Sequence, residues 1–168
     1  MRCLCTLELV GRGCPEAPGL LAERLAESST VCQVTGARGV VAWNDPALGA
    51  LLRLRVLLYA TEDPELLSEC FEGLLILDAE ANRDFVERWL MDDGPRAECA
   101  LLALAGTRQE CMEHIQAWLG RHVDPRMRKV GFIALALLRT DEARAELDHL
   151  IQWGTATDQA MATEARGL

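Results

Sequence analysis

Aspartate followed by proline recurs at a nearly fixed interval in the second half of this chain. An Asp side chain just before a helix accepts hydrogen bonds from free backbone N–H groups, and Pro at the first helical position loses nothing by lacking one. Each such sequence precedes a strongly apolar stretch. The starts lie thirty and thirty-one residues apart, at Asp63-Pro64, Asp93-Gly94-Pro95 and Asp124-Pro125. This spacing is close to the period of a two-helix repeat, so it predicts a series of helix pairs.

The apolar residues after each start keep the same register. Within each stretch they fall at positions i, i+3 and i+7, which is one buried face of an α-helix. Corresponding positions lie thirty residues apart: Leu67, Ala97 and Met127, then Cys70, Ala100 and Val130, then Leu74, Leu104 and Ala134. Leu and Ala are plentiful and only 5% of the residues are aromatic, which also favours helices over strands.

A short break and a more amphipathic second helix follow each first helix. The second helices are expected near 81–91, 108–120 and 141–153, after breaks at 78–80, 106–107 and 140–141. Upstream, weaker patterns predict helix pairs near 2–12 and 16–27, then 30–43 and 46–60. Within the helix expected at 30–43, Gly36 and Gly39 disfavour a helical backbone.

On these features the chain resembles the HEAT-repeat family of HEAT/armadillo-like α-solenoids. The matching residues are the Asp-Pro entries, an arginine in the first helix (Arg96, Arg128) and the Leu/Ala ladder that follows. The resemblance implies an all-α, right-handed solenoid of about five antiparallel helix hairpins, with second helices lining the concave side. A single domain at 1–168 would contain repeats at 1–28, 29–61, 62–92, 93–122 and 123–154, then a partial repeat at 155–168.

Both ends of this pattern predict part of a longer solenoid. Residues 156–166 have the pattern of a first helix, and no second helix follows them. Met1 is followed almost directly by an apolar helical pattern. Solenoids normally close with polar capping repeats, because an open end exposes a hydrophobic face. We therefore expect either a continuing chain or end-to-end association through open ends.

The net charge and the spacing of the cysteines limit which partners and which cellular compartment we expect. The net charge of −9 disfavours nucleic acid, whose binding needs clustered Lys and Arg. The acid excess is local, since residues 61–92 carry ten acids against Arg83 and Arg88. The seven cysteines form no C-x-x-C pair, which favours reduced thiols in a cytoplasmic protein. No apolar run approaches the ~20 residues of a membrane-spanning helix, so no membrane association is expected.

The predicted second helices carry the candidate binding residues. Aligned by their tryptophans, they give the pairs Phe85/Trp89, His114/Trp118 and His149/Trp153, each four residues apart and so on one helix face. Trp118 and Trp153, with His114 and His149, are candidate anchors for a partner in the concave groove, because Trp combines a large contact area with a polar N–H. The alternative is that these aromatics pack between neighbouring repeats, and Phe85 with Trp89 fits that alternative better. Glu80, Asp84 and Glu87 would set the charge preference of the same surface.

Two further clusters admit a chemical interpretation. His114 and His149 have acids nearby at 110, 113, 146 and 148, which are metal-ligand types, but such residues are ordinary on a helix surface and no metal is expected. A basic stretch contains Arg121, His122, Arg126, Arg128 and Lys129. It is either a small anion or acidic-peptide site, or a set of arginines that pair with neighbouring acids and support a helix C-terminus, and the second is favoured.

The chain contains no phosphate-cradling G-x-x-x-x-G-K-[ST], no G-x-S-x-G and no H-E-x-x-H. The favoured hypothesis is a noncatalytic protein- or peptide-binding scaffold that uses the concave face and needs no cofactor. One alternative is a HEAT-like lyase or modifying enzyme, similar to the bilin lyases, with a site in the same groove. Another is a structural spacer within a longer solenoid.

Overall fold

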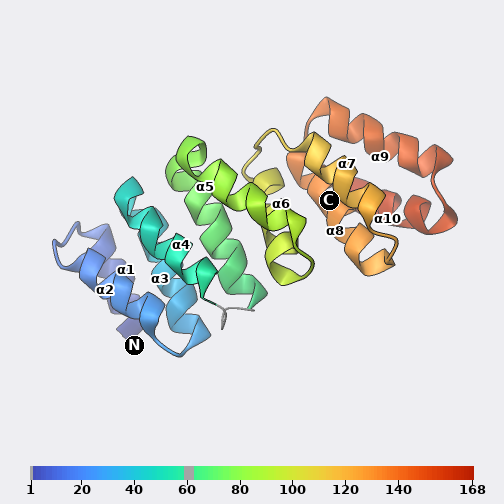
Figure 1. The fold of residues 1–168 in the computed structure, drawn as a ribbon. Helices are drawn as coiled ribbons and strands as arrows, with labels where there is room; N and C mark the ends of the chain where they lie inside the picture. The colour runs from blue at the N-terminus through green and yellow to red at the C-terminus, as the bar shows by residue number, and fades with distance from the viewer. Residues whose placement is uncertain (1, 59–62) are drawn as a thin grey trace. The chain divides into compact units, whose positions relative to one another are not determined.

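A computed structural model describes the backbone of residues 2–58 and 63–168, and the side chains in these ranges from Thr6 onward. Within them the chain forms ten α-helices, two short 3-10 helices and no strand (Figure 1). The predicted all-α class is confirmed. None of these helices has the length and apolar character that crossing a membrane requires. The end of the helix expected at 46–60, and the thiols of Cys3 and Cys5, lie outside the described residues.

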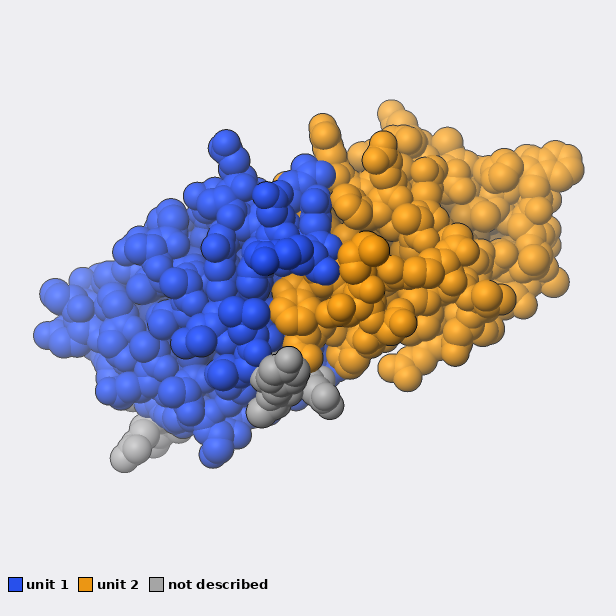
Figure 2. Space-filling view, in the orientation of Figure 1, with its two compact units in different colours: residues 1–88 blue, residues 89–168 orange. Residues whose placement is uncertain are grey.

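The helices belong to two compact units, Met1–Arg88 (unit 1) and Trp89–Leu168 (unit 2), which Figure 2 colours separately. Each unit has its own apolar core. The core of unit 1 includes Leu21, Leu52, Leu67, Phe71 and Leu74, and that of unit 2 includes Leu101, Leu104, Ile115, Phe132 and Leu135. Burial of such side chains removes apolar surface from water and is the main stabilising contribution in each unit.

Unit 1 is organised around α3, which packs against α1, α2 and α5, while α4 packs along α5. Its elements are α1 (Arg2–Gly11), α2 (Ala17–Ala26), α3 (Thr30–Trp43), η1 (Pro46–Leu48), α4 (Gly49–Leu57) and α5 (Pro64–Glu87). The helix predicted at 30–43, despite its two glycines, is thus confirmed. A Cβ atom on Gly39 would lie 2.3 Å from Leu21 Cδ2, so the glycine allows α2 and α3 to approach closely.

α5 contains the two helices that the sequence predicts as separate. Asp78 has non-helical backbone angles (φ −162°, ψ 92°), and its Oδ1 accepts a hydrogen bond from Ala81 N at 3.0 Å, which caps the second part. The buried Asn82 side chain donates to Leu74 O at 2.9 Å and to Asp78 O at 2.8 Å. These bonds satisfy carbonyl groups at the end of the first part. The predicted break is confirmed.

Unit 2 is organised around α8, which packs against α6, α7, α9 and α10, and α9 also packs against α10. Its elements are η2 (Arg88–Met91, beginning at the unit boundary), α6 (Pro95–Gly106), α7 (Met112–Arg121), α8 (Pro125–Leu138), α9 (Asp141–Trp153) and α10 (Ala156–Arg166). α9 and α10 have the predicted bounds. α7 begins later than predicted, because Arg108 adopts a left-handed backbone conformation (φ 57°) and the chain turns before the helix.

Two of the three Asp-Pro starts are capped as predicted. Asp63 Oδ1 accepts from the backbone N–H groups two and three residues later, at 3.0 and 3.2 Å, and Asp124 Oδ1 accepts from that of Arg126 at 2.7 Å. The expected cap by Asp93 is wrong. Gly94 occupies the N-cap position of α6, with φ 116° and no side-chain hydrogen bond. The glycine between Asp and Pro moves the carboxylate one residue away from the capping position.

α7 and α8 approach closely at Gly131. A Cβ atom there would lie 2.6 Å from Leu119 Cδ2, 2.9 Å from Leu119 Cγ and 3.1 Å from Trp118 Cδ1. Leu119 and Trp118 are both buried, so neither can move freely. Gly120, on α7, would have no atom within 4 Å of an added Cβ. Two glycines in unit 2 therefore face opposite packing conditions.

We expect Gly131→Ala to lower the free energy of unfolding by about 1–3 kcal/mol, because the extra methyl group displaces buried side chains. Gly120→Ala is the matched control. It should raise the free energy of unfolding by about 0.5–1 kcal/mol, because alanine has less freedom than glycine in the unfolded chain. Urea unfolding followed by circular dichroism measures both, and equal effects of the two substitutions would contradict this packing.

Candidate functional site

The two predicted tryptophan anchors have different environments within unit 2. Trp118, on α7, is 2% exposed, and its Nε1–H donates to Met127 O at 2.7 Å. The Arg121 guanidinium lies 5.5 Å from the centre of its ring. Trp153, at the end of α9, is 75% exposed. The packing alternative therefore describes Trp118, whereas Trp153 presents its indole at the surface.

The two histidines differ in a similar way. His149 is exposed on α9, four residues before Trp153. His114 is half-buried on α7, and its Nδ1 is buried with no hydrogen-bond partner among the described residues. Across the described ranges, no three His, Cys, Asp or Glu side chains come together in a group that could hold a metal ion. The histidines and their neighbouring acids thus form no such group.

The remaining predicted site residues lie in unit 1, on the second part of α5. Glu80 and Asp84 are exposed. Glu87 is half-buried and forms an ion pair with Arg83, with 2.6 Å between Oε1 and Nε. Phe85, which we expect in the core, is buried. The role of the three acids in setting a charge preference stays a prediction.

Most of the predicted basic stretch is engaged in contacts inside unit 2. Arg121 donates to Leu90 O at 2.7 Å, and Lys129 pairs with Glu164 at 2.8 Å. Arg126 makes no ion pair with the part of the chain that the structure describes. Lys129 thus pairs with an acid and Arg121 with a backbone carbonyl group, whereas pairing of Arg126 with an acid is not found among the described residues.

Arg128, on α8, contacts the end of α7 and the start of α10. Its Nε lies 2.8 Å from Asp158 Oδ1, and its Nη1 donates to Leu119 O and, at 3.1 Å, to His122 O. The two charged side chains are 20% and 10% exposed. Burial raises the pKa of Asp158, but hydrogen bonds from Arg128 and Thr155 outweigh burial and hold this pKa below its ordinary value. The contact fixes the start of α10 against α8 and the end of α7.

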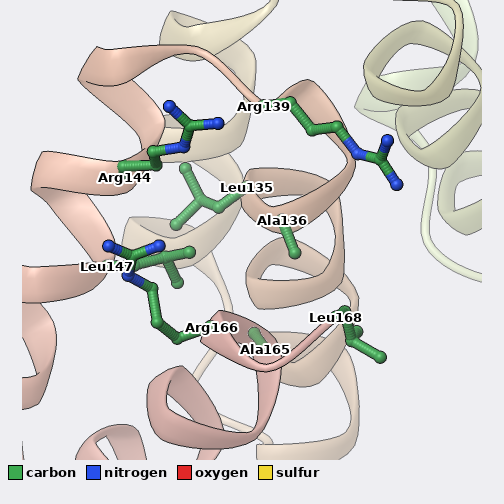
Figure 3. A pocket seen from close by; sticks show the side chains of 8 residues that line it. All are labelled: Leu135, Ala136, Arg139, Arg144, Leu147, Ala165, Arg166 and Leu168. Carbon is green, nitrogen blue, oxygen red and sulfur yellow. The ribbon is translucent and has the colours of Figure 1, made fainter.

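A pocket of about 380 Å³ lies among α8, α9 and α10 (Figure 3). We call it the arginine pocket, and it is lined by Leu135, Ala136, Arg139, Arg144, Leu147, Ala165, Arg166 and Leu168. Leu135, Leu147 and Ala165 are buried, so the floor of the pocket is continuous with the core of unit 2. Small-molecule sites commonly have volumes of about 300–1,000 Å³, apolar linings and a few polar groups. The arginine pocket has such a volume, and its lining combines aliphatic residues with three arginines.

Helix ends and helix surfaces position its three arginines. Arg139 is the C-cap of α8 and has a left-handed backbone conformation (φ 55°, ψ 20°). It makes no hydrogen bond or ion pair with the described ranges of the chain. Arg144 Nη1 pairs with Asp141 Oδ1 at 3.0 Å, and Arg166 Nε pairs with Asp148 Oδ1 at 3.0 Å. Among the described residues, one arginine is thus unpaired and two form surface ion pairs.

The sequence patterns do not identify the arginine pocket. Its arginines belong to no motif, and the chain separation between Arg144 and Arg166 hides their proximity. A partial signal exists at Arg139, which lies thirty-one residues after Arg108. Both arginines follow a first helix, and both have a left-handed backbone conformation. That register indicates a position in the repeat but not a pocket.

Comparisons with protein-family models, curated proteins and solved structures find no match to this chain.

We expect Asp158→Asn to lower the free energy of unfolding by ~3 kcal/mol at neutral pH, because it leaves a largely buried guanidinium without its charged partner. This difference should depend on pH. The pKa of Asp158 is lower in the folded than in the unfolded chain, so its ionisation stabilises the fold above about pH 4. The contribution is lost as the pH falls through the folded pKa.

Urea unfolding at neutral and acidic pH measures the effect. Asp141→Asn is the control, because that carboxylate is 99% exposed in its pair with Arg144 and should contribute little. A stability difference for Asp158→Asn that stays constant into the acidic range would contradict this account.

Proposed function

We propose that this chain is a HEAT-like α-solenoid that works as a noncatalytic protein- or peptide-binding scaffold. The helix packing in unit 2 supports the proposal. The expected first helices α6, α8 and α10 pack in succession, and the expected second helices α7 and α9 pack beside α8. Stacked hairpins of this kind give helical-repeat proteins a continuous core and an extended binding surface. By resemblance to the HEAT family, α7 and α9 would line the concave side.

The exposed indole of Trp153 is the observation that carries the proposal. A tryptophan that is 75% exposed to water is unusual, because its large apolar surface is normally substantially buried. Tryptophan is also among the residues that dominate binding energy once a partner covers them. On α9 it shares an exposed surface, which we call the α9 face, with Glu142, Ala145, His149 and Gln152.

The α9 face indicates what kind of partner it fits. It combines one large aromatic side chain with a small residue, a histidine, an amide and an acid, and the half-buried Glu146 lies on the same side of the helix. A partner with an apolar recess for the indole and a polar rim would match this surface. In unit 1, the exposed Glu80 and Asp84 are proposed to favour a partner with basic groups. Glu87 contributes less, because Arg83 already neutralises it.

A photo-crosslinking amino acid at Gln152, beside Trp153, identifies the protein that covers the α9 face in cells. We expect Trp153→Ala to weaken binding of that protein by about thirtyfold or more, since loss of a central tryptophan contact costs ~2 kcal/mol or more. The free energy of unfolding should change by less than about 0.5 kcal/mol, because the side chain is exposed. Isothermal titration calorimetry and urea unfolding measure the two effects.

Two variants serve as controls. Val123→Ala removes another highly exposed apolar side chain of unit 2 and should leave the affinity unchanged. Trp118→Phe should lower the free energy of unfolding by about 1 kcal/mol, because it removes the hydrogen bond to Met127 O, and should not weaken binding by the folded protein. Undiminished affinity in Trp153→Ala would overturn the proposal.

A further inference from the structure

The arginine pocket has positive charge at both ends of an apolar middle. Figure 3 shows the guanidinium groups of Arg144 and Arg166 on one side of Leu135 and Ala136, whereas the side chain of Arg139 extends on the other side. The floor between the two ends is aliphatic. A ligand that matches this lining needs an apolar centre with an anionic group at each end.

The three arginines are available to such a ligand. Arg139 makes no hydrogen bond or ion pair within the described parts of the chain. Arg144 and Arg166 pair with Asp141 and Asp148, whose side chains are 99% and 58% exposed. Water and salt screen such exposed pairs, which therefore stabilise little, and a ligand carboxylate can replace them. Guanidinium groups suit this exchange because their planar donors bind a carboxylate through two parallel hydrogen bonds.

We propose that the arginine pocket binds a small linear aliphatic dicarboxylate. One carboxylate binds Arg144 and Arg166, the other binds Arg139, and the methylene chain covers the floor at Leu135 and Ala136. Burial of the methylene groups removes apolar surface of the ligand and of the half-buried Ala136 from water. The volume of about 380 Å³ lies toward the small end of the usual range for ligand sites, which favours a free small molecule.

The geometry also distinguishes this ligand from other anions. A single compact anion such as phosphate would contact Arg144 and Arg166 but would leave Arg139, which extends away from them, without a partner. A monocarboxylate leaves one cationic end without a partner. The inference is independent of the proposed partner surface, because no residue of the α9 face lines the arginine pocket.

Isothermal titration calorimetry at low ionic strength tests the proposal with adipate, suberate, sebacate and dodecanedioate. For each diacid, the monocarboxylate of the same chain length is the reference ligand. We expect one chain length to bind best, and to bind at least about tenfold more tightly than its monocarboxylate, because the second carboxylate adds charge-assisted hydrogen bonds. Equal affinity for diacid and monocarboxylate, or no saturable binding of any diacid, would overturn the proposal.

Substitutions in the arginine pocket test where the diacid binds. Arg139→Gln should lower the affinity for the best diacid about tenfold, to the level of the monocarboxylate, while leaving monocarboxylate binding unchanged. Arg108→Gln is the matched control, because Arg108 has the same left-handed backbone (φ 57°) after a first helix and does not line the pocket. Ala136→Leu should weaken all the aliphatic ligands by filling the floor.

Arg139→Gln and Arg108→Gln should melt at the wild-type temperature, since both arginines are exposed. Trp153→Ala should bind the diacid as the wild type does, so failure of the partner surface and failure of the pocket are separable. Undiminished diacid binding in Arg139→Gln would contradict the two-ended arrangement.

Discussion

Arg128 holds the helices of unit 2 in the positions on which the arginine pocket depends. Its guanidinium donates to the carbonyl groups of Leu119 and His122, which carry partial negative charge at the end of α7. It also forms an ion pair with Asp158, in the first turn of α10. Desolvation offsets much of the attraction in a buried ion pair. The contact fixes the position of α10, and removal of one partner is destabilising because it leaves the other charge buried and unpaired. α10 in turn supplies Arg166 to one end of the pocket.

Unit 1 meets a similar constraint at a helix end with a different side chain. Where α5 is interrupted, the Asn82 amide donates to the carbonyl groups of Leu74 and Asp78, and its Oδ1 accepts from Arg53 Nε at 2.7 Å. Backbone carbonyl groups at a helix end have no partner in their own helix, and leaving them unpaired in the interior costs free energy. In both units, a polar side chain from the following helix satisfies these groups. The chain can therefore turn between packed helices without losing hydrogen bonds.

These features explain which parts of the fold the sequence predicts. The bounds of α9 and α10 depend on local signals, since Thr140 and Thr155 each accept a hydrogen bond from the helix that they begin. The late start of α7 depends on the left-handed backbone of Arg108, for which the sequence offers no rule. Trp118 and Trp153 have the same spacing from a histidine, but α8 covers the first and leaves the second exposed. Spacing identifies a helix face, whereas its exposure depends on the neighbouring helix. The stacking of hairpins into a solenoid stays a prediction.

A cationic pocket is compatible with a net charge of −9 because electrostatic interactions in water have a short range. At physiological salt the screening length is about 8 Å, so an acid excess elsewhere on the chain has little effect on a local site. That excess falls in residues 61–92, almost entirely within unit 1, whereas the arginine pocket belongs to unit 2. The argument from net charge applies to an extended phosphate-binding surface, which needs many clustered cations. It does not apply to a pocket of three arginines, where the free guanidinium of Arg139 and the exchangeable pairs of Arg144 and Arg166 determine which anion can bind.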